Sequence, residues 1–190
     1  FIAKDPLPLE QSLRIALEAA HDRGVVHRDL KPDNIHLRFL ADGEAQAKVL
    51  DFGIAKVAGT SRELASVQSI GGLFCGTPEY MSPEQATGDQ AVGASTGTYA
   101  LGSVLYEMLV GEPPYTGGSA QAILGKIIQG KPVSAAEERP TVPANVDAAV
   151  RKALEKLPAD RFKSAAGFAA GLNDPHFTTT PISGLASAPA

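Results

Sequence analysis

Apolar residues recur at helical spacing in five stretches of this chain, and each stretch predicts a helix. The first runs from about Leu9 to Asp22, between Pro8 and Gly24, which are typical of a helix entry and exit. The second, 99–110, is apolar on nearly every side and therefore predicts a buried central helix. The remaining three helices are predicted over 119–129, 146–157 and 164–172.

Two short runs typical of β-strands, 34–39 and 47–50, are separated by turn residues and predict a small hairpin. Residues 53–76 are rich in Gly, Ser and Thr with weak periodicity, so we expect a long loop that is functional or mobile. After Asn173 the sequence becomes Thr-Thr-Thr-Pro and then Ser, Gly, Ala and Pro, which is typical of a linker or a disordered tail. The pattern therefore predicts a mostly helical α+β domain over 1–172 and a tail over 173–190.

Composition narrows the class of protein. The 190 residues are 44% apolar and 20% charged, which is compatible with one packed domain. A net charge of −4 argues against a strongly basic nucleic-acid binder, and the single Cys75 excludes an intramolecular disulfide and a multi-cysteine metal site. We find no membrane segment and expect a cytoplasmic location. The chain begins at Phe1 rather than Met, which is compatible with a piece of a longer protein.

Residues 27–34, His-Arg-Asp-Leu-Lys-Pro-Asp-Asn, lie between the first predicted helix and the first predicted strand and carry the chemistry. Phosphoryl transfer needs a carboxylate near the attacking hydroxyl, a cation near the moving phosphoryl group, and oxygen ligands for magnesium. Asp29 and Lys31 are two residues apart, so in extended backbone they project to the same side. Asn34 offers one hard oxygen ligand, and Asp51 at the end of the second strand offers another.

These residues resemble the catalytic loop of protein kinases, and Asp51-Phe52-Gly53 resembles the magnesium-binding motif that follows that loop. Residues 76–84 resemble the end of a kinase activation segment, with Ser-Pro-Glu in place of Ala-Pro-Glu. Arg161 stands where the family places the arginine that pairs with that glutamate, Glu84. Over 7–172 the chain is similar to the C-terminal lobe of a bacterial serine/threonine kinase of the eukaryotic type.

The resemblance implies a role for each motif residue, with ATP and Mg²⁺ as cofactors and a protein Ser or Thr as the acceptor. Asp29 would accept or orient the proton of the substrate hydroxyl, and Lys31 would neutralise the transferring phosphate. Asn34 and Asp51 would hold magnesium, so that Lys31, Asn34 and Asp51 together bind the cofactor.

The resemblance also implies supporting residues. Arg28 would receive a phosphate on the activation segment, Thr77 would line the hydroxyl site, and Phe52 would pack in a regulatory stack beside the flexible Gly53. Glu84 and Arg161 would form a structural ion pair. The sequence does not choose among the possible phosphate acceptors of the activation segment, which are Thr60, Ser61, Ser66 and Ser69.

Three departures from the family pattern stand out. The sequence shows no Gly-rich phosphate loop, no Val-Ala-Ile-Lys-like strand and no partner-glutamate helix, so the resemblance lacks the upper lobe. The first helix is roughly seven residues shorter than in the family, which is about two turns. Gly97 stands where the family has an aspartate that accepts N–H groups of the catalytic loop, so we expect a loosened loop.

Several alternatives stay open. The chain is either a kinase catalytic lobe that works with an upper-lobe or parent-chain partner, or a truncated or degraded pseudokinase that binds a protein. A misread frame without a stable fold is a third possibility. Taken alone, Asp51-Phe52-Gly53 is also compatible with a strand-end turn, and Glu84 and Arg161 with an unrelated solvated pair. Cys75 is interpreted as a small apolar residue rather than a nucleophile, because no activating neighbour is evident.

Overall fold

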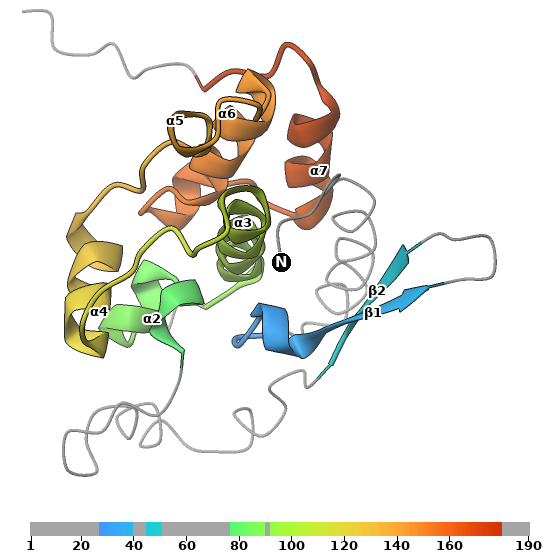
Figure 1. The fold of residues 1–190 in the computed structure, drawn as a ribbon. Helices are drawn as coiled ribbons and strands as arrows, with labels where there is room; N and C mark the ends of the chain where they lie inside the picture. Colours follow the sequence, from blue (N-terminus) through green and yellow to red (C-terminus); the bar gives the residue numbers. More distant parts are fainter. Residues whose placement is uncertain (1–26, 40–44, 51–76, 90–91, 180–190) are drawn as a thin grey trace, which may run out of the picture.

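The computed structural model describes residues 27–39, 45–50, 77–89 and 92–179. Within these ranges the helices gather into one body, and a two-stranded hairpin projects from its side (Figure 1). This arrangement confirms the predicted class, mostly helical with one small hairpin. The predicted first helix and the 53–76 loop lie outside the described residues.

The hairpin pairs β1 (Ile35–Phe39) with β2 (Ala45–Val49) in antiparallel register, with Ile35 opposite Val49. Both strands are confirmed, and β2 begins two residues earlier than the sequence predicted. A 3₁₀ turn, η1 (Pro32–Asn34), leads directly into β1. The hairpin is closed at its base where the N–H of Leu50 donates to the carbonyl oxygen of Asn34 at 2.8 Å. The hairpin therefore fixes the end of the catalytic-type loop.

The central helix is α3 (Ala94–Val110), and most of its residues are buried. It begins five residues before the predicted start at 99. The missed turn holds Ser, Thr and Gly, which are weak helix formers, but the Thr96 hydroxyl accepts the N–H of Gly93 at 3.2 Å and so caps the new start. Gly111, at φ 105°, ends the helix in the left-handed region.

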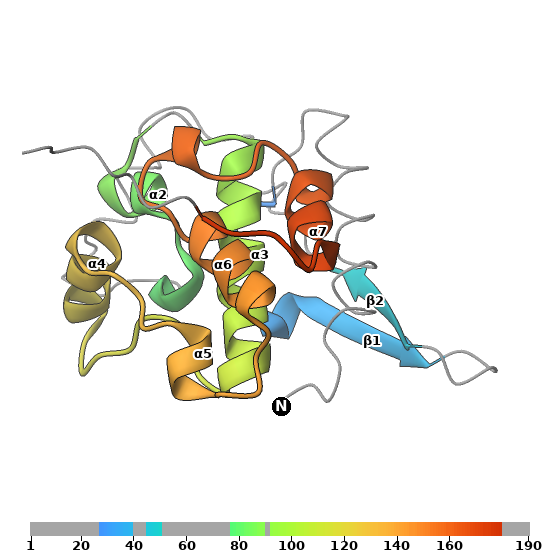
Figure 2. The same ribbon diagram turned by 90° about the horizontal axis from the view of Figure 1, so that it is seen from above.

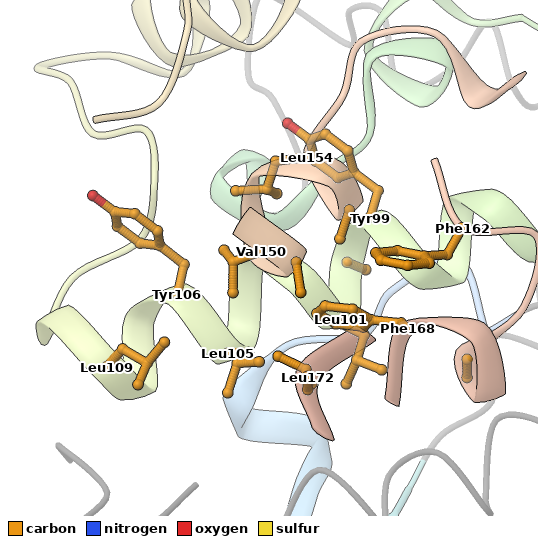
Figure 3. Close-up of a cluster of buried hydrophobic side chains, with 14 of the residues drawn as sticks. Tyr99, Leu101, Leu105, Tyr106, Leu109, Val150, Leu154, Phe162, Phe168 and Leu172 are labelled. Atoms are coloured by element: carbon orange, nitrogen blue, oxygen red, sulfur yellow. The ribbon is translucent and has the colours of Figure 1, made fainter. Parts of the chain in front are cut away.

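Two further helices, α6 (Ala144–Ala153) and α7 (Ala165–Asn173), lie against α3 (Figure 2). Figure 3 shows the apolar core between them, to which α3, α6 and α7 all contribute; its labelled members include Leu101, Leu105, Val150, Phe168 and Leu172. The α6 helix ends at residue 153, four residues before the predicted end. The reason is Pro158, which opens the next 3₁₀ turn, η5 (Pro158–Asp160), and holds Leu157 extended.

The packed part of the chain continues past the expected boundary at residue 172. Asn173 belongs to α7, and the ring of Phe177 lies 5.6 Å from that of Phe162. Phe162 in turn lies 5.4 Å from Phe168 in the core. Phe177, which directly precedes the Thr-rich run, therefore packs against the core of the lobe.

A second, smaller apolar cluster lies beside the main core. Its helix is α4 (Ala120–Gln129), which starts one residue after the predicted start at Ser119 and packs on α2 (Pro83–Thr87) and η4 (Pro78–Tyr80). Its buried members are Tyr115, Ile123, Leu124 and Ile127. The short elements α2, η4 and α5 (Ala135–Glu138) were not predicted, because helices of one turn leave little periodicity to detect.

Candidate active site

Four predicted site residues, Asp29, Lys31, Asn34 and Thr77, lie together beside η1. The amide nitrogen Nδ2 of Asn34 donates to the carbonyl oxygen of Asp29 at 2.8 Å and approaches the carboxylate oxygen Oδ2 of Asp29 at 3.5 Å. The ammonium of Lys31 donates to the hydroxyl of Thr77 at 3.2 Å, across 46 residues of sequence. The structure thus brings the catalytic-type loop and the end of the activation-type segment to one place.

Local geometry explains how Lys31 reaches Thr77. Lys31 is extended, with φ −155° and ψ 164°, as expected for a residue before proline. Pro32 begins η1, and the N–H of Asn34 donates back to the carbonyl oxygen of Lys31 at 3.0 Å. The sequence order Lys-Pro-Asp-Asn therefore sets an extended residue followed by a single tight turn.

His27 is fully buried and links the start of the loop to the end of β2. Its Nε2 lies 2.9 Å from the carbonyl oxygen of Leu50, which can only accept, so we assign the proton to Nε2. Nδ1 is then an acceptor, and the N–H of Asp29 donates to it at 3.3 Å. The sequence analysis gave this histidine no role of its own; its place in the motif was the available signal.

Arg28 is the one non-glycine residue with a positive φ, 60°, within the ranges the structure describes. Such a conformation costs roughly 1–3 kcal/mol and persists where neighbouring contacts enforce it. The carbonyl oxygen of Arg28 accepts a hydrogen bond from Nε2 of Gln85 at 2.8 Å. Sequence reasoning missed Gln85, because nothing in the string pairs residues 57 positions apart.

Gly97 bears on the expected loosening of this loop. It lies buried in the first turns of α3 and has no side chain to accept a hydrogen bond. The N–H of Asp29 nevertheless has an acceptor, the imidazole of His27, and the loop is also held by Gln85 and Asn34. The N–H of Asp29 therefore has an acceptor without Gly97, and the expected loosening of the loop stays a prediction.

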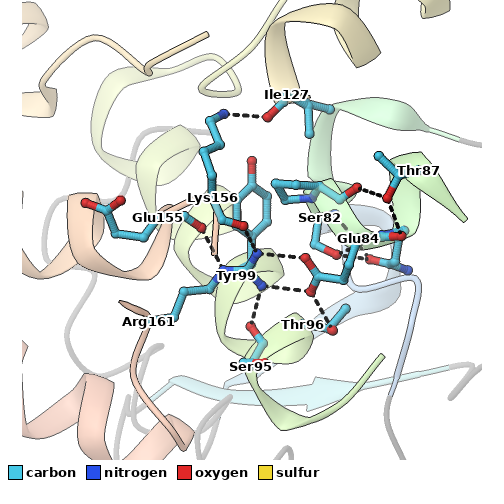
Figure 4. A network of polar contacts seen from close by, with 12 residues as sticks. Ser82, Glu84, Thr87, Ser95, Thr96, Tyr99, Ile127, Glu155, Lys156 and Arg161 are labelled. Carbon is cyan, nitrogen blue, oxygen red and sulfur yellow. Dashed lines mark hydrogen bonds and ion pairs between the residues drawn. The ribbon is translucent and has the colours of Figure 1, made fainter. Parts of the chain in front are cut away.

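Glu84 and Arg161 form a buried, bidentate ion pair (Figure 4). Nη1 of Arg161 lies 2.8 Å from Oε1 of Glu84, and Nη2 lies 2.7 Å from Oε2. The two side chains are 0% and 4% exposed, so the alternative of a solvated surface pair is wrong. The hydroxyl of Thr96 adds a third bond, donating to Oε1 at 2.7 Å.

The surroundings of this pair compensate its burial. Burial raises the pKa of Glu84, but the hydrogen bonds from Arg161 and Thr96 outweigh it and leave the pKa below its ordinary value. Arg161 also donates to the carbonyl oxygens of Glu155 and Lys156, and its guanidinium lies 4.9 Å from the ring centre of Tyr99. A buried charge pair with all these partners anchors α2 to the start of α3.

Polar contacts of Tyr80 and Lys156 were not predicted. The hydroxyl of Tyr80 donates to Oε2 of Glu107 at 2.6 Å, which ties η4 to α3. Glu107 is the only charged residue in the apolar stretch 99–110, and that isolation was a usable signal. Lys156 donates to the Tyr115 hydroxyl at 2.6 Å and to the carbonyl oxygen of Ile127 at 2.5 Å, and burial lowers its pKa to about 8.

Of the two expected magnesium ligands, Asn34 lies within the described residues. Because Nδ2 of Asn34 is turned to Asp29, its oxygen Oδ1 is the atom left to serve as a hard ligand, which fits the expected role. Asp51, Phe52, Gly53 and the four possible phosphate acceptors lie outside the described residues, so their roles stay predictions. Within the described part of the chain, no group of three or more His, Cys, Asp or Glu residues could hold a metal ion.

The fold is kinase-like. Its helices surround the buried helix α3, and the loop with Asp29, Lys31 and Asn34 leads into the hairpin. The chain belongs to the protein kinase family, because residues 9–177 match the family described as "Protein kinase domain". That match includes the loop, η4, α2 and Arg161.

The chain is similar to bacterial proteins named as serine/threonine-protein kinases. Serine/threonine-protein kinase PknB of Mycobacterium leprae is 36% identical over 182 residues, covering 93% of this chain and 28% of that protein. The probable serine/threonine-protein kinase PknB of Corynebacterium glutamicum is 40% identical over 161 residues, covering 83% and 24%. Serine/threonine-protein kinase Pkn1 of Myxococcus xanthus is 43% identical over 155 residues, covering 80% and 21%.

The chain therefore spans between 21% and 28% of the length of these relatives. None of the helices in the described ranges combines the length and apolar character needed to cross a bilayer.

Proposed function

We propose that this chain forms the catalytic lobe of a serine/threonine protein kinase, which transfers the γ-phosphate of ATP to a protein Ser or Thr. The observation that carries the proposal is the contact between Lys31 and Thr77 at 3.2 Å, beside an Asp29 held by Asn34 at 2.8 Å. The carboxylate of Asp29 and the cation of Lys31 are two of the groups that phosphoryl transfer needs, and Asn34 offers an oxygen ligand for magnesium.

Each residue has a defined task in this proposal. The substrate hydroxyl oxygen bonds to the γ-phosphorus as the bond from that phosphorus to the bridging oxygen breaks, releasing ADP. Asp29 orients the hydroxyl and accepts its proton, while Lys31 neutralises negative charge on the phosphoryl oxygens. Bound Mg²⁺ would neutralise charge on the phosphate oxygens, with Asn34 and Asp51 as its ligands.

Substrate and setting follow from the same chemistry. Thr77, bonded to Lys31, lines the position of the acceptor hydroxyl, so a protein Ser or Thr is the proposed substrate class. Positioning a triphosphate needs a second wall, which an upper lobe or a parent-chain partner would supply. The supply of ATP in the cytoplasm makes that compartment the proposed location.

The direct test joins the chain to a kinase upper lobe and measures phosphate incorporation into a Ser- and Thr-containing protein. Asp29→Asn keeps the shape of the side chain but removes its basicity, so incorporation should fall at least about 100-fold. Asp160→Asn, an exposed aspartate in η5, is the matched control and should leave incorporation unchanged. Equal incorporation by Asp29→Asn and the control would refute the proposal.

A protein-binding pseudokinase is the second candidate, and Gly97 is the observation that favours it. Gly97 has no acceptor side chain for the N–H groups of the loop, at the position where the kinase pattern has an aspartate. This candidate expects no nucleotide binding and no dependence on Asp29. Calorimetric titration of the joined protein with Mg²⁺ and ATP distinguishes the two, because the kinase proposal requires binding.

A further inference from the structure

We propose that Gln85 is a positioning residue, which fixes Asp29 by holding the strained carbonyl of Arg28. The inference rests on the proposed function, because Asp29 is its proposed base. It starts from one contact, the hydrogen bond from Nε2 of Gln85 to the carbonyl oxygen of Arg28 at 2.8 Å.

The orientation of the Gln85 amide is determined at both of its ends. Oε1 accepts from the N–H of Ser82 at 3.2 Å and from the Ser82 hydroxyl at 3.1 Å. A backbone N–H can only donate, so the atom facing it is the oxygen. The carbonyl of Arg28 can only accept, so the atom facing it is Nε2. Both ends require the same orientation, and the side chain has no alternative to donating to the loop.

The carbonyl oxygen of Arg28 lies at the point of the loop where a hydrogen bond restrains the backbone most. Arg28 has φ 60°, a conformation that needs enforcement by neighbouring contacts. The same peptide unit carries the N–H of Asp29, which donates to His27, and the carbonyl oxygen of Asp29 accepts from Asn34. Releasing the Arg28 carbonyl lets this peptide rotate, and rotation moves the Asp29 backbone away from both partners.

The position of Gln85 is fixed in turn by the neighbouring ion pair. Glu84, the neighbour of Gln85 in α2, is clamped by Arg161 at 2.7 Å. Successive residues of α2 thus face different partners, one in the buried ion pair and one in the catalytic-type loop. The ion pair keeps α2 in place, and Gln85 transmits that placement to Asp29.

The test uses the 190-residue chain and measures amide hydrogen exchange by NMR. Gln85→Glu keeps the shape and the acceptor for Ser82 but replaces the donor with a carboxylate oxygen. We expect exchange at the N–H groups of Asp29 and Asn34 to become about tenfold faster, with amides of α3 unchanged. Gln121→Glu, an exposed residue of α4 with the same charge change, is the control.

Acid should reverse the effect, which distinguishes positioning from general support. At about pH 5 the carboxylate introduced by Gln85→Glu, which faces the carbonyl oxygen of Arg28, takes up a proton and can donate a hydrogen bond to it. The exchange ratio between Gln85→Glu and Gln121→Glu should then return toward one. If Gln85→Glu does not fold, Gln85→Met should show the faster loop exchange without recovery in acid.

Two outcomes overturn the proposal. One is unchanged exchange at Asp29 and Asn34 in a folded Gln85→Glu or Gln85→Met chain. The other is acceleration spread equally into α3, which would make Gln85 a general structural residue. Hydrogen exchange is measured without nucleotide or substrate, so it tests the role of Gln85 separately from phosphate transfer. If Gln85→Glu accelerates exchange in the loop but Asp29→Asn leaves phosphate transfer unchanged, only the proposed function is contradicted.

Discussion

Two ion pairs formed by motif residues differ in almost every physical respect. Glu84 and Arg161 are bidentate, 2.7 Å apart, and 4% and 0% exposed. Lys31 and Asp33 approach only to 3.8 Å, with side chains 21% and 79% exposed. The first pair is sealed and holds α2, whereas the second leaves the Lys31 ammonium accessible beside Thr77. The motif residues Glu84 and Arg161 therefore fix the structure, whereas the motif residue Lys31 stays accessible at the candidate site.

The strongest way to break this contrast is to remove Arg161. Arg161→Met leaves the Glu84 carboxylate buried without its cation, so the free energy of unfolding should fall by about 3–5 kcal/mol. Urea unfolding monitored by circular dichroism measures it. Arg38→Met, an exposed arginine of β1, is the control and should stay within about 0.5 kcal/mol of the parent. A loss for Arg161→Met no larger than the control's would contradict a sealed anchor.

Removing Lys31 should separate stability from activity. Because its pair with Asp33 is exposed, Lys31→Met should change the free energy of unfolding by less than about 1 kcal/mol. In the protein joined to an upper lobe, phosphate transfer should fall about 100-fold or more, since the cation that neutralises the phosphoryl oxygens is lost. A destabilisation matching that of Arg161→Met would show that the two pairs do not differ as described.

The smallest expected effect is a pH dependence from Lys156. Burial, and next the charge of Arg161, lower its pKa from 10.5 to about 8. Between these values the unfolded chain binds more protons than the folded one, so stability should rise as the pH is raised through this window. Burial raises the pKa of Tyr99 and Tyr115, which should reverse the trend above their ordinary pKa of 10.0.

The measurement is urea unfolding at several pH values between about 7.5 and 9.5. Lys156→Arg keeps the cation but does not titrate in this range, so its stability should lack the rise. An identical rise in the parent and in Lys156→Arg would assign the pH dependence to another group.

Patterns that are local in the sequence predicted most of the fold. The periodic stretches located α3, α4, α6 and α7, and Ser119 and Ser164 marked helix starts that the structure caps with those side chains. One-turn elements such as α2 were missed, and Phe177 was assigned to the tail. These depend on tertiary contacts, which periodicity does not record.

The candidate site divides in the same way. Asp29, Lys31 and Asn34 could be predicted together because one short motif carries them. Gln85 and Glu107 could not, because each meets its partner only after the chain has folded across tens of residues. The resemblance named Glu84 and Arg161, but only the structure shows the Thr96 hydroxyl that joins them.

Gly102 sets a limit on how this lobe can be altered. A Cβ atom placed there would lie 2.8 Å from the Cβ of Ala153, so α3 and α6 touch at a point with no room for a methyl group. The routine stabilising exchange of a helical glycine for alanine would force the two helices apart here. A Cβ atom placed at Gly125 would meet no atom of another part of the protein within 4 Å, so the exchange to alanine meets no obstacle there. Substitutions meant to stabilise the protein should therefore leave Gly102 unchanged, where α3 meets α6, and begin at Gly125 on α4.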